Sequence, residues 1–136
     1  MTEKHWDWVT AEDAILAHQQ SIANYGGSDG IRDIGGLESA LAYPKNLAAY
    51  GDPGLAELAA GYLFAIAKNY AFVNGNKRKA WTVMRLFIGL NGGKLEYDRF
   101  DAVKFVEGVA GGTIDFESAR DWIEGRLKVD ILLGYS

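Results

Sequence analysis

The sequence predicts an all-α fold, a compact bundle of about six helices in one domain that spans residues 1–136. Apolar residues recur at steps of three and four along several segments, which is the periodicity of a helix with one buried face. Both prolines, Pro44 and Pro53, fall between those segments. With 136 residues, of which 49% are hydrophobic and 24% charged, the chain suits a single globular core.

Composition argues against several functional classes. The formal net charge of −4 speaks against direct binding of nucleic acid. Because cysteine is absent, we expect no disulfide, thiolate nucleophile or cysteine-based zinc site, which is compatible with the cytoplasm. No apolar run approaches the roughly 18 residues of a membrane span, and Arg85 interrupts the longest. Glu3, Lys4 and Asp7 are unlike a signal peptide.

Three helices are predicted before residue 70. The first covers residues 11–25, with Thr10 as N-cap and Asp13 at the capping-box position. A glycine-rich loop follows, and residues 36–43 form a short helix that stops before Pro44. The third is the clearest, and we expect Asp52 as its N-cap, with proline next. Its apolar stripe consists of Leu55, Leu58, Ala59, Tyr62, Leu63 and Ile66.

The helix that begins at Lys77 is apolar on most sides, so we place it at the centre of the fold. It ends at the glycines after Asn91, and residues 94–97 form a short extended piece. Two weaker helices, at about 98–109 and 115–127, begin after Asp98 and Asp115, which are candidate N-caps.

The segment from Tyr70 to Arg78 is the candidate functional loop. Asn74, Gly75 and Asn76 suit a tight turn that opens a helix. Lys77 and Arg78 then occupy the first turn, where acids are usually preferred because the helix dipole is positive there. A bound anion would relieve that repulsion, so the pattern predicts a phosphate site. A capped helix start with two solvated cations is the alternative.

Common nucleotide-binding loops do not account for this segment. The chain contains no G-x-x-x-x-G-K-[ST] sequence and no G-x-G-x-x-G after a strand. The sequence therefore argues against a nucleotide-binding fold of either of these two kinds.

The loop resembles the core motif of the Fic superfamily. Phe72 to Arg78, followed by Lys79, is most similar to the Doc (death-on-curing) toxin branch, whose pattern runs H-x-F-x-[D/N]-[A/G]-N-K-R. The resemblance covers about residues 8–125 and includes earlier segments, namely Ala17–Gln19, Asn24–Ser28, Gly30–Asp33 and Gly36–Leu41. It implies a Fic/Doc-like all-α fold in which residues 36–43 form a flap over the site.

Two positions depart from the family pattern. Tyr70 stands where the family has its catalytic histidine, and Asn74 stands where many members carry an acid that helps to hold the metal. The resemblance therefore implies a site whose proton acceptor and metal ligand are both altered.

The resemblance also implies a function. Doc-like toxins act in toxin–antitoxin modules as protein kinases that transfer the γ-phosphate of ATP to elongation factor Tu, and so arrest translation. Asn76, Lys77 and Arg78 would hold phosphate oxygens, Gly75 would allow close backbone approach, and Phe72 would anchor the loop. Mg²⁺ would be held mainly by the phosphates, with weak help from Asn74. The antitoxin would place a helical C-terminal segment in a groove over the site.

Tyr70 predicts impaired transfer. A general base contributes about 10²–10⁴-fold and needs a pKa near the working pH, whereas tyrosine has a pKa near 10. Only about one phenol in 10³ is ionised at neutral pH, at a cost of roughly 4 kcal/mol. The expected protein binds nucleotide and partner yet transfers little.

Two alternative functions stay open. One is transfer of a nucleotide such as AMP to a protein hydroxyl, although that branch usually has glycine where this chain has Lys77. The other is a non-catalytic module that binds an antitoxin or another partner.

Overall fold

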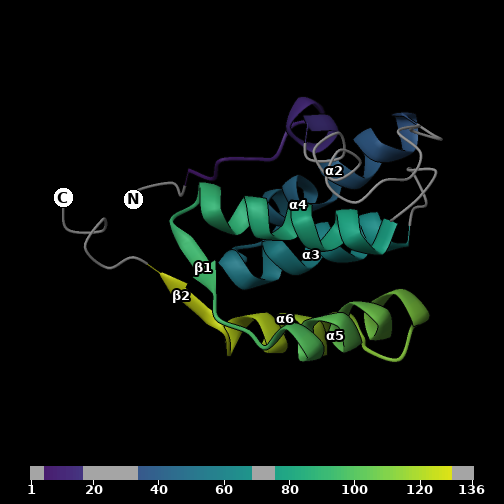
Figure 1. The fold of residues 1–136 in the computed structure, drawn as a ribbon. Helices are drawn as coiled ribbons and strands as arrows, with labels where there is room; N and C mark the ends of the chain where they lie inside the picture. Colours follow the sequence, from purple (N-terminus) through teal and green to yellow (C-terminus); the bar gives the residue numbers. More distant parts are fainter. Residues whose placement is uncertain (1–4, 17–33, 69–75, 130–136) are drawn as a thin grey trace.

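The computed structural model describes residues 5–16, 34–68 and 76–129, and the all-α prediction is confirmed (Figure 1). Residues 11–16 are helical. The other elements, in order, are α2 (Ile34–Tyr50), α3 (Leu55–Ala67), α4 (Asn76–Leu90), β1 (Gly93–Leu95), α5 (Arg99–Gly111), α6 (Phe116–Glu124) and β2 (Leu127–Val129). The predicted end of the first helix near residue 25 lies outside the described residues.

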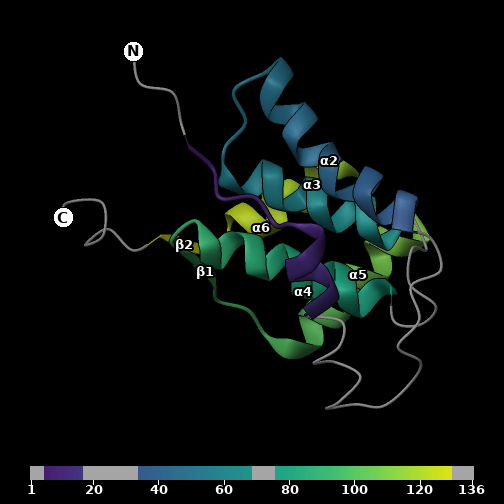
Figure 2. The same ribbon diagram turned by 90° about the horizontal axis from the view of Figure 1, so that it is seen from above.

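Helix α3, rather than α4, lies at the centre. It packs against α2, α4, α5 and α6, and Figure 1 shows α5 and α6 as a layer below α3 and α4. Seen from above, residues 5–16 cross over α4 (Figure 2). The central placement predicted for α4 was wrong because its apolar side chains are interrupted by exposed Lys77, Arg78 and Arg85. Helix α3 carries one charged residue, Glu57, and so can be enclosed on more sides.

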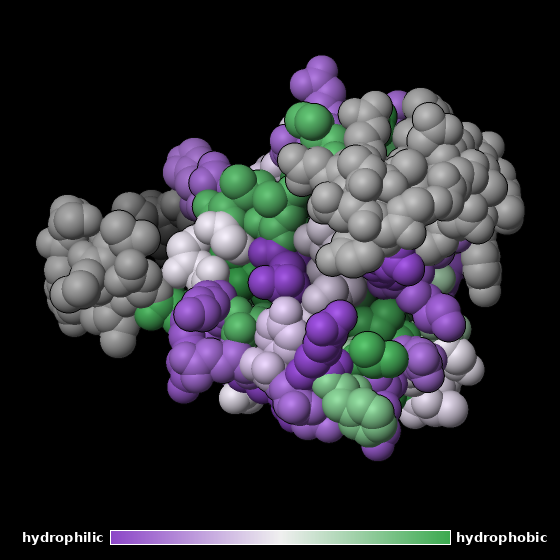
Figure 3. Space-filling model, in the orientation of Figure 1, coloured by the Kyte–Doolittle hydropathy of each residue, from purple (hydrophilic) through white to green (hydrophobic). Residues whose placement is uncertain are grey.

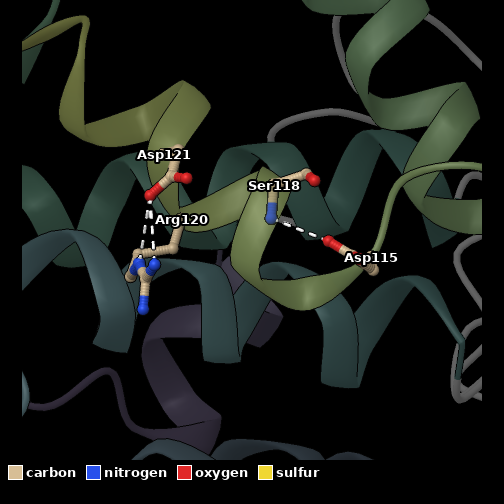
Figure 4. A network of polar contacts seen from close by, with 4 residues as sticks. All are labelled: Asp115, Ser118, Arg120 and Asp121. Carbon is tan, nitrogen blue, oxygen red and sulfur yellow. Dashed lines mark hydrogen bonds and ion pairs between the residues drawn. The ribbon is translucent and has the colours of Figure 1, made fainter.

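Most of the predicted caps are confirmed. The Asp13 N–H donates to Thr10 Oγ1 and the Thr10 N–H donates to Asp13 Oδ2, both at 3.1 Å, which is a reciprocal capping box. The Asp98 side chain caps α5. At α6, the Asp115 carboxylate accepts from the Ser118 N–H at 2.8 Å, one turn before the Arg120–Asp121 ion pair (Figure 4).

The predicted start of α3 was wrong. Gly54, not Asp52, is its N-cap, and no side chain caps it. Pro53 is buried just before that cap. A glycine carries no side chain that could accept a hydrogen bond, so this helix start is stabilised by packing of α3 in the core.

The predicted stop before Pro44 was also wrong. Helix α2 runs through Pro44 to Tyr50, so the segment 36–43 that we expected as a short flap is the first half of a longer helix. Pro44 removes one backbone donor, but it is buried against α3 where Gly61 leaves room: a Cβ at Gly61 would lie 3.5 Å from Pro44 Cγ. Tertiary packing therefore outweighs the local preference to end the helix.

Strands β1 and β2 pair antiparallel, with Lys94 opposite Lys128. The predicted extended piece at 94–97 is confirmed in part, as β1, but the last helix ends at Glu124 instead of 127 because β2 follows. Aromatic rings brace this end of the molecule: the Trp122 ring stacks on Phe105 at 3.9 Å, and Trp81 of α4 meets Trp122 edge-on.

On the face shown in Figure 3, hydrophobic and hydrophilic side chains of the described residues are intermixed. Within the described ranges, no helix has both the length and the apolar composition that a membrane crossing requires.

Candidate functional site

The opening of α4 is where the described part of the predicted site lies. Asn76 begins the helix and is half-buried, whereas Lys77 and Arg78 are exposed in its first turn. The other predicted site residues, Tyr70, Phe72, Asn74 and Gly75, lie outside the described residues. The structure therefore brings together three of the seven residues that the sequence singled out.

Charge at this helix start is unusually one-sided. The first turn of α4 contains no acidic residue, while Lys77, Arg78 and Lys79 follow one another directly. By comparison, the first turns of α5 and α6 contain Asp101 and Glu117. The positive end of the helix dipole adds to the cationic charge, so the α4 opening favours an anion.

Lys79 is the residue that sequence reasoning missed. It is only 2% exposed and shares the core face of α4 with Ala80, Val83 and Met84. Its spacing contained the signal, because Lys79, Val83 and Phe87 follow one another at steps of four along the buried stripe.

Burial changes the chemistry of this lysine. Loss of contact with water lowers the pKa of the Lys79 amine below its usual value, and the charge of neighbouring Arg78 lowers it further. An anion close to such an amine would favour its charged form.

The remainder of α4 contains fewer features of a ligand site than its first turn does. Its middle is hollowed by an open depression, lined by Thr82, Arg85, Leu86, Gly89 and Leu90, which does not include the first turn. Thr82 lies six residues after Asn76, about 9 Å along the axis. Within the described ranges, no three His, Asp or Glu residues gather as metal ligands.

Comparisons with known proteins show which family this chain resembles. Residues 8–88 match the model of the Fic/DOC family. The "Protein kinase doc" of Escherichia phage P1 is 32% identical over 114 residues, covering 83% of this chain and 90% of that protein. The "Toxin Doc" of Mycolicibacterium smegmatis is 39% identical over 95 residues, covering 68% of this chain and 70% of that protein.

The family match covers the segment that contains the candidate site. The matched residues include α2, α3, the candidate loop and most of α4, which are the elements that hold Asn76, Lys77 and Arg78 at a helix start. The match with the phage protein extends over most of both chains. This chain belongs to the Fic/DOC family.

Proposed function

We propose that this chain is a Doc-like toxin of a toxin–antitoxin module, built for transfer of the γ-phosphate of ATP to a protein hydroxyl. The observation that carries the proposal is the exposed cation pair Lys77 and Arg78 in the first turn of α4, within a matched Fic/DOC segment. One relative is named a protein kinase and the other a toxin, which supports this choice of reaction and role.

The described residues fit the polyphosphate of ATP. Arg78 can grip two oxygens of one phosphate with its planar guanidinium, and Lys77 supplies a compact charge on a flexible stem. Backbone N–H groups at the start of α4 add donors directed at the same anion. When ATP is bound, these groups would stabilise the charge that shifts toward the leaving ADP oxygen as the hydroxyl oxygen attacks the γ-phosphorus.

Tyr70 is proposed to limit the transfer. The attacking hydroxyl must lose its proton, and the family's histidine is replaced here by a phenol whose ordinary pKa near 10 makes it a poor acceptor at neutral pH. Binding does not need that proton transfer, so ATP affinity survives. Induction of the Tyr70→His variant should arrest growth in cells where the original chain does not. Growth after reversion would contradict a toxin disabled at this one position.

The proposed partners follow from the same resemblance. The target is elongation factor Tu in the cytoplasm, and the antitoxin covers the site with a helical segment. Mg²⁺ would neutralise charge on the phosphates, and Asn74 would hold it only weakly, because an amide oxygen brings no charge to the metal.

Labelled ATP tests the reaction. The Tyr70→His variant is incubated with Mg²⁺, purified elongation factor Tu and ATP labelled at the α- or γ-phosphate. Label that arrives only from the γ-position supports a kinase. Transfer from the α-position would instead show nucleotidyl transfer, and transfer from neither position would favour a binding module.

A further inference from the structure

Lys79 is a charged residue that has no role in the phosphate transfer proposed above. Among the described residues it is the sole charged side chain in the core. Its amine forms no hydrogen bond or ion pair with any other described residue. It therefore differs from Lys77, which is exposed to solvent in the same turn.

Helix geometry favours a Lys79 side chain that leans toward the α4 opening. Side chains of an α-helix lean toward its N-terminus and cover the turn before their own Cα. Lys79 is three residues, about 4.5 Å of axial rise, after Asn76. From this tendency we infer that its four-carbon stem extends along the core face toward the helix start, where the backbone N–H groups point the same way.

A buried amine without a hydrogen-bond or ion-pair partner among the described residues weakens the free protein. Val83 and Met84, its neighbours on this face, are apolar, and an apolar residue of similar volume would pack there without loss of hydration. Locally unfavourable residues of this kind are expected at functional sites, where a ligand supplies the missing interaction. Burial and the charge of Arg78 lower the pKa of this amine, and a bound anion would offset both effects.

We propose that Lys79 is a third cationic ligand of the polyphosphate, which it contacts from the core side of the α4 opening while Lys77 and Arg78 contact it from the solvent side. This inference rests on the proposed function and adds to it a specificity-determining residue outside the N-K-R motif. The chemical group recognised is a phosphate oxygen of a polyphosphate, whether or not a nucleoside is attached.

Calorimetry with sodium tripolyphosphate and with Mg²⁺–ATP tests the proposal on the full chain. Lys79→Met keeps the length of the side chain and removes its charge. Lys104→Met removes the same charge from the exposed face of α5 and is the matched control. Thermal unfolding of each variant without ligand reports the structural role separately.

The proposal predicts opposite effects on stability and binding. Lys79→Met should melt at the same temperature as the original chain or higher, yet bind both probes about tenfold or more weakly, while Lys104→Met binds as the original does. Equal affinities of Lys79→Met and the original chain would overturn the role of Lys79 and leave the proposed function intact. A clearly lower melting temperature for Lys79→Met would also overturn it, because the amine would then be stabilised in the free protein. No binding of either probe by the original chain would contradict both.

Discussion

Asn91 holds the backbone of Asp7 by two hydrogen bonds, although 84 residues separate them in the sequence. Its Oδ1 accepts from the Asp7 N–H at 2.9 Å, and its Nδ2 donates to the Asp7 carbonyl at 3.0 Å. The same Nδ2 also donates to the Phe87 carbonyl at 2.8 Å. One amide therefore ends α4 and fastens the N-terminal segment across it.

Replacement of this amide should loosen that attachment. We expect Asn91→Ala to lower the free energy of unfolding by about 1–2 kcal/mol, because two backbone groups of Asp7 lose their partner. Urea denaturation of the variant measures the loss. Asn46→Ala, on the exposed side of α2, is the matched control and should change little. Equal effects of the two variants would contradict the role of Asn91.

Two glycines near the end of α4 should respond to alanine in opposite directions. A Cβ at Gly93 would lie 2.9 Å from Ile88 Cγ2 and 3.1 Å from Leu55 Cδ2, so Gly93→Ala should destabilise by about 1–2 kcal/mol. A Cβ at Gly89 would meet nothing within 4 Å, and alanine there should stabilise the helix by up to about 1 kcal/mol. Melting temperatures that shift in the same direction would be inconsistent with this packing.

Tyr62 makes stability depend on alkaline pH. Its hydroxyl accepts from the Val9 N–H at 3.0 Å, and burial raises the pKa of this phenol from 10.0 to about 12, with a smaller contribution from the charge of Asp13. Between those values the unfolded chain releases the proton first, so its contribution to stability is complete below pH 10 and is lost as pH rises toward 12. The loss should reach about 2–3 kcal/mol.

Tyr62→Phe isolates this contribution. At neutral pH the variant should be about 1–2 kcal/mol less stable than the original chain, because the buried Val9 N–H loses its acceptor. Urea titrations at pH 8 to 11 should show the two stabilities converging as pH rises. Parallel pH profiles would mean that the Tyr62 hydroxyl does not carry the effect.

Local sequence signals predicted the helices that begin with a side-chain cap. Thr10, Asp98 and Asp115 bond within three residues of their own position, so the chain nearby is sufficient to identify them. The helix end predicted before Pro44 was wrong because the proline's local preference to end a helix is outweighed by packing against Gly61 on another helix.

Long-range pairing explains the remaining differences. Strand β2 forms through backbone pairing with β1, which is distant in the sequence, and three residues of strand carry too little pattern to be recognised alone. At the site, the exposure of Lys77 and Arg78 followed from their place in the first turn. The burial of Lys79 depends on the packing of α4 in the core; charge and motif do not reveal it, and its steps of four to Val83 and Phe87 are the one local signal.

The cation pair at the start of α4 should decide nucleotide affinity. Arg78→Ala and Lys77→Ala should each weaken Mg²⁺–ATP binding about tenfold or more, because each removes a charge-assisted contact to phosphate. Arg99→Ala is the control, since Arg99 also lies in a first turn, that of α5, but beside the acid Asp101. Calorimetry on the three variants checks this. If Arg99→Ala weakens binding as much as the other two, the affinity reflects general charge rather than the α4 opening.

The rate of γ-phosphate transfer by Tyr70→His, compared with the chain that carries Tyr70, tests the account most directly. Both proteins are given saturating Mg²⁺–ATP and the same amount of elongation factor Tu, so that proton acceptance at position 70 is the difference between them. If Tyr70 limits the transfer, histidine should accelerate it by about 10²–10⁴-fold with little change in ATP affinity. Equal rates, or acceleration that comes wholly from tighter ATP binding, would contradict it.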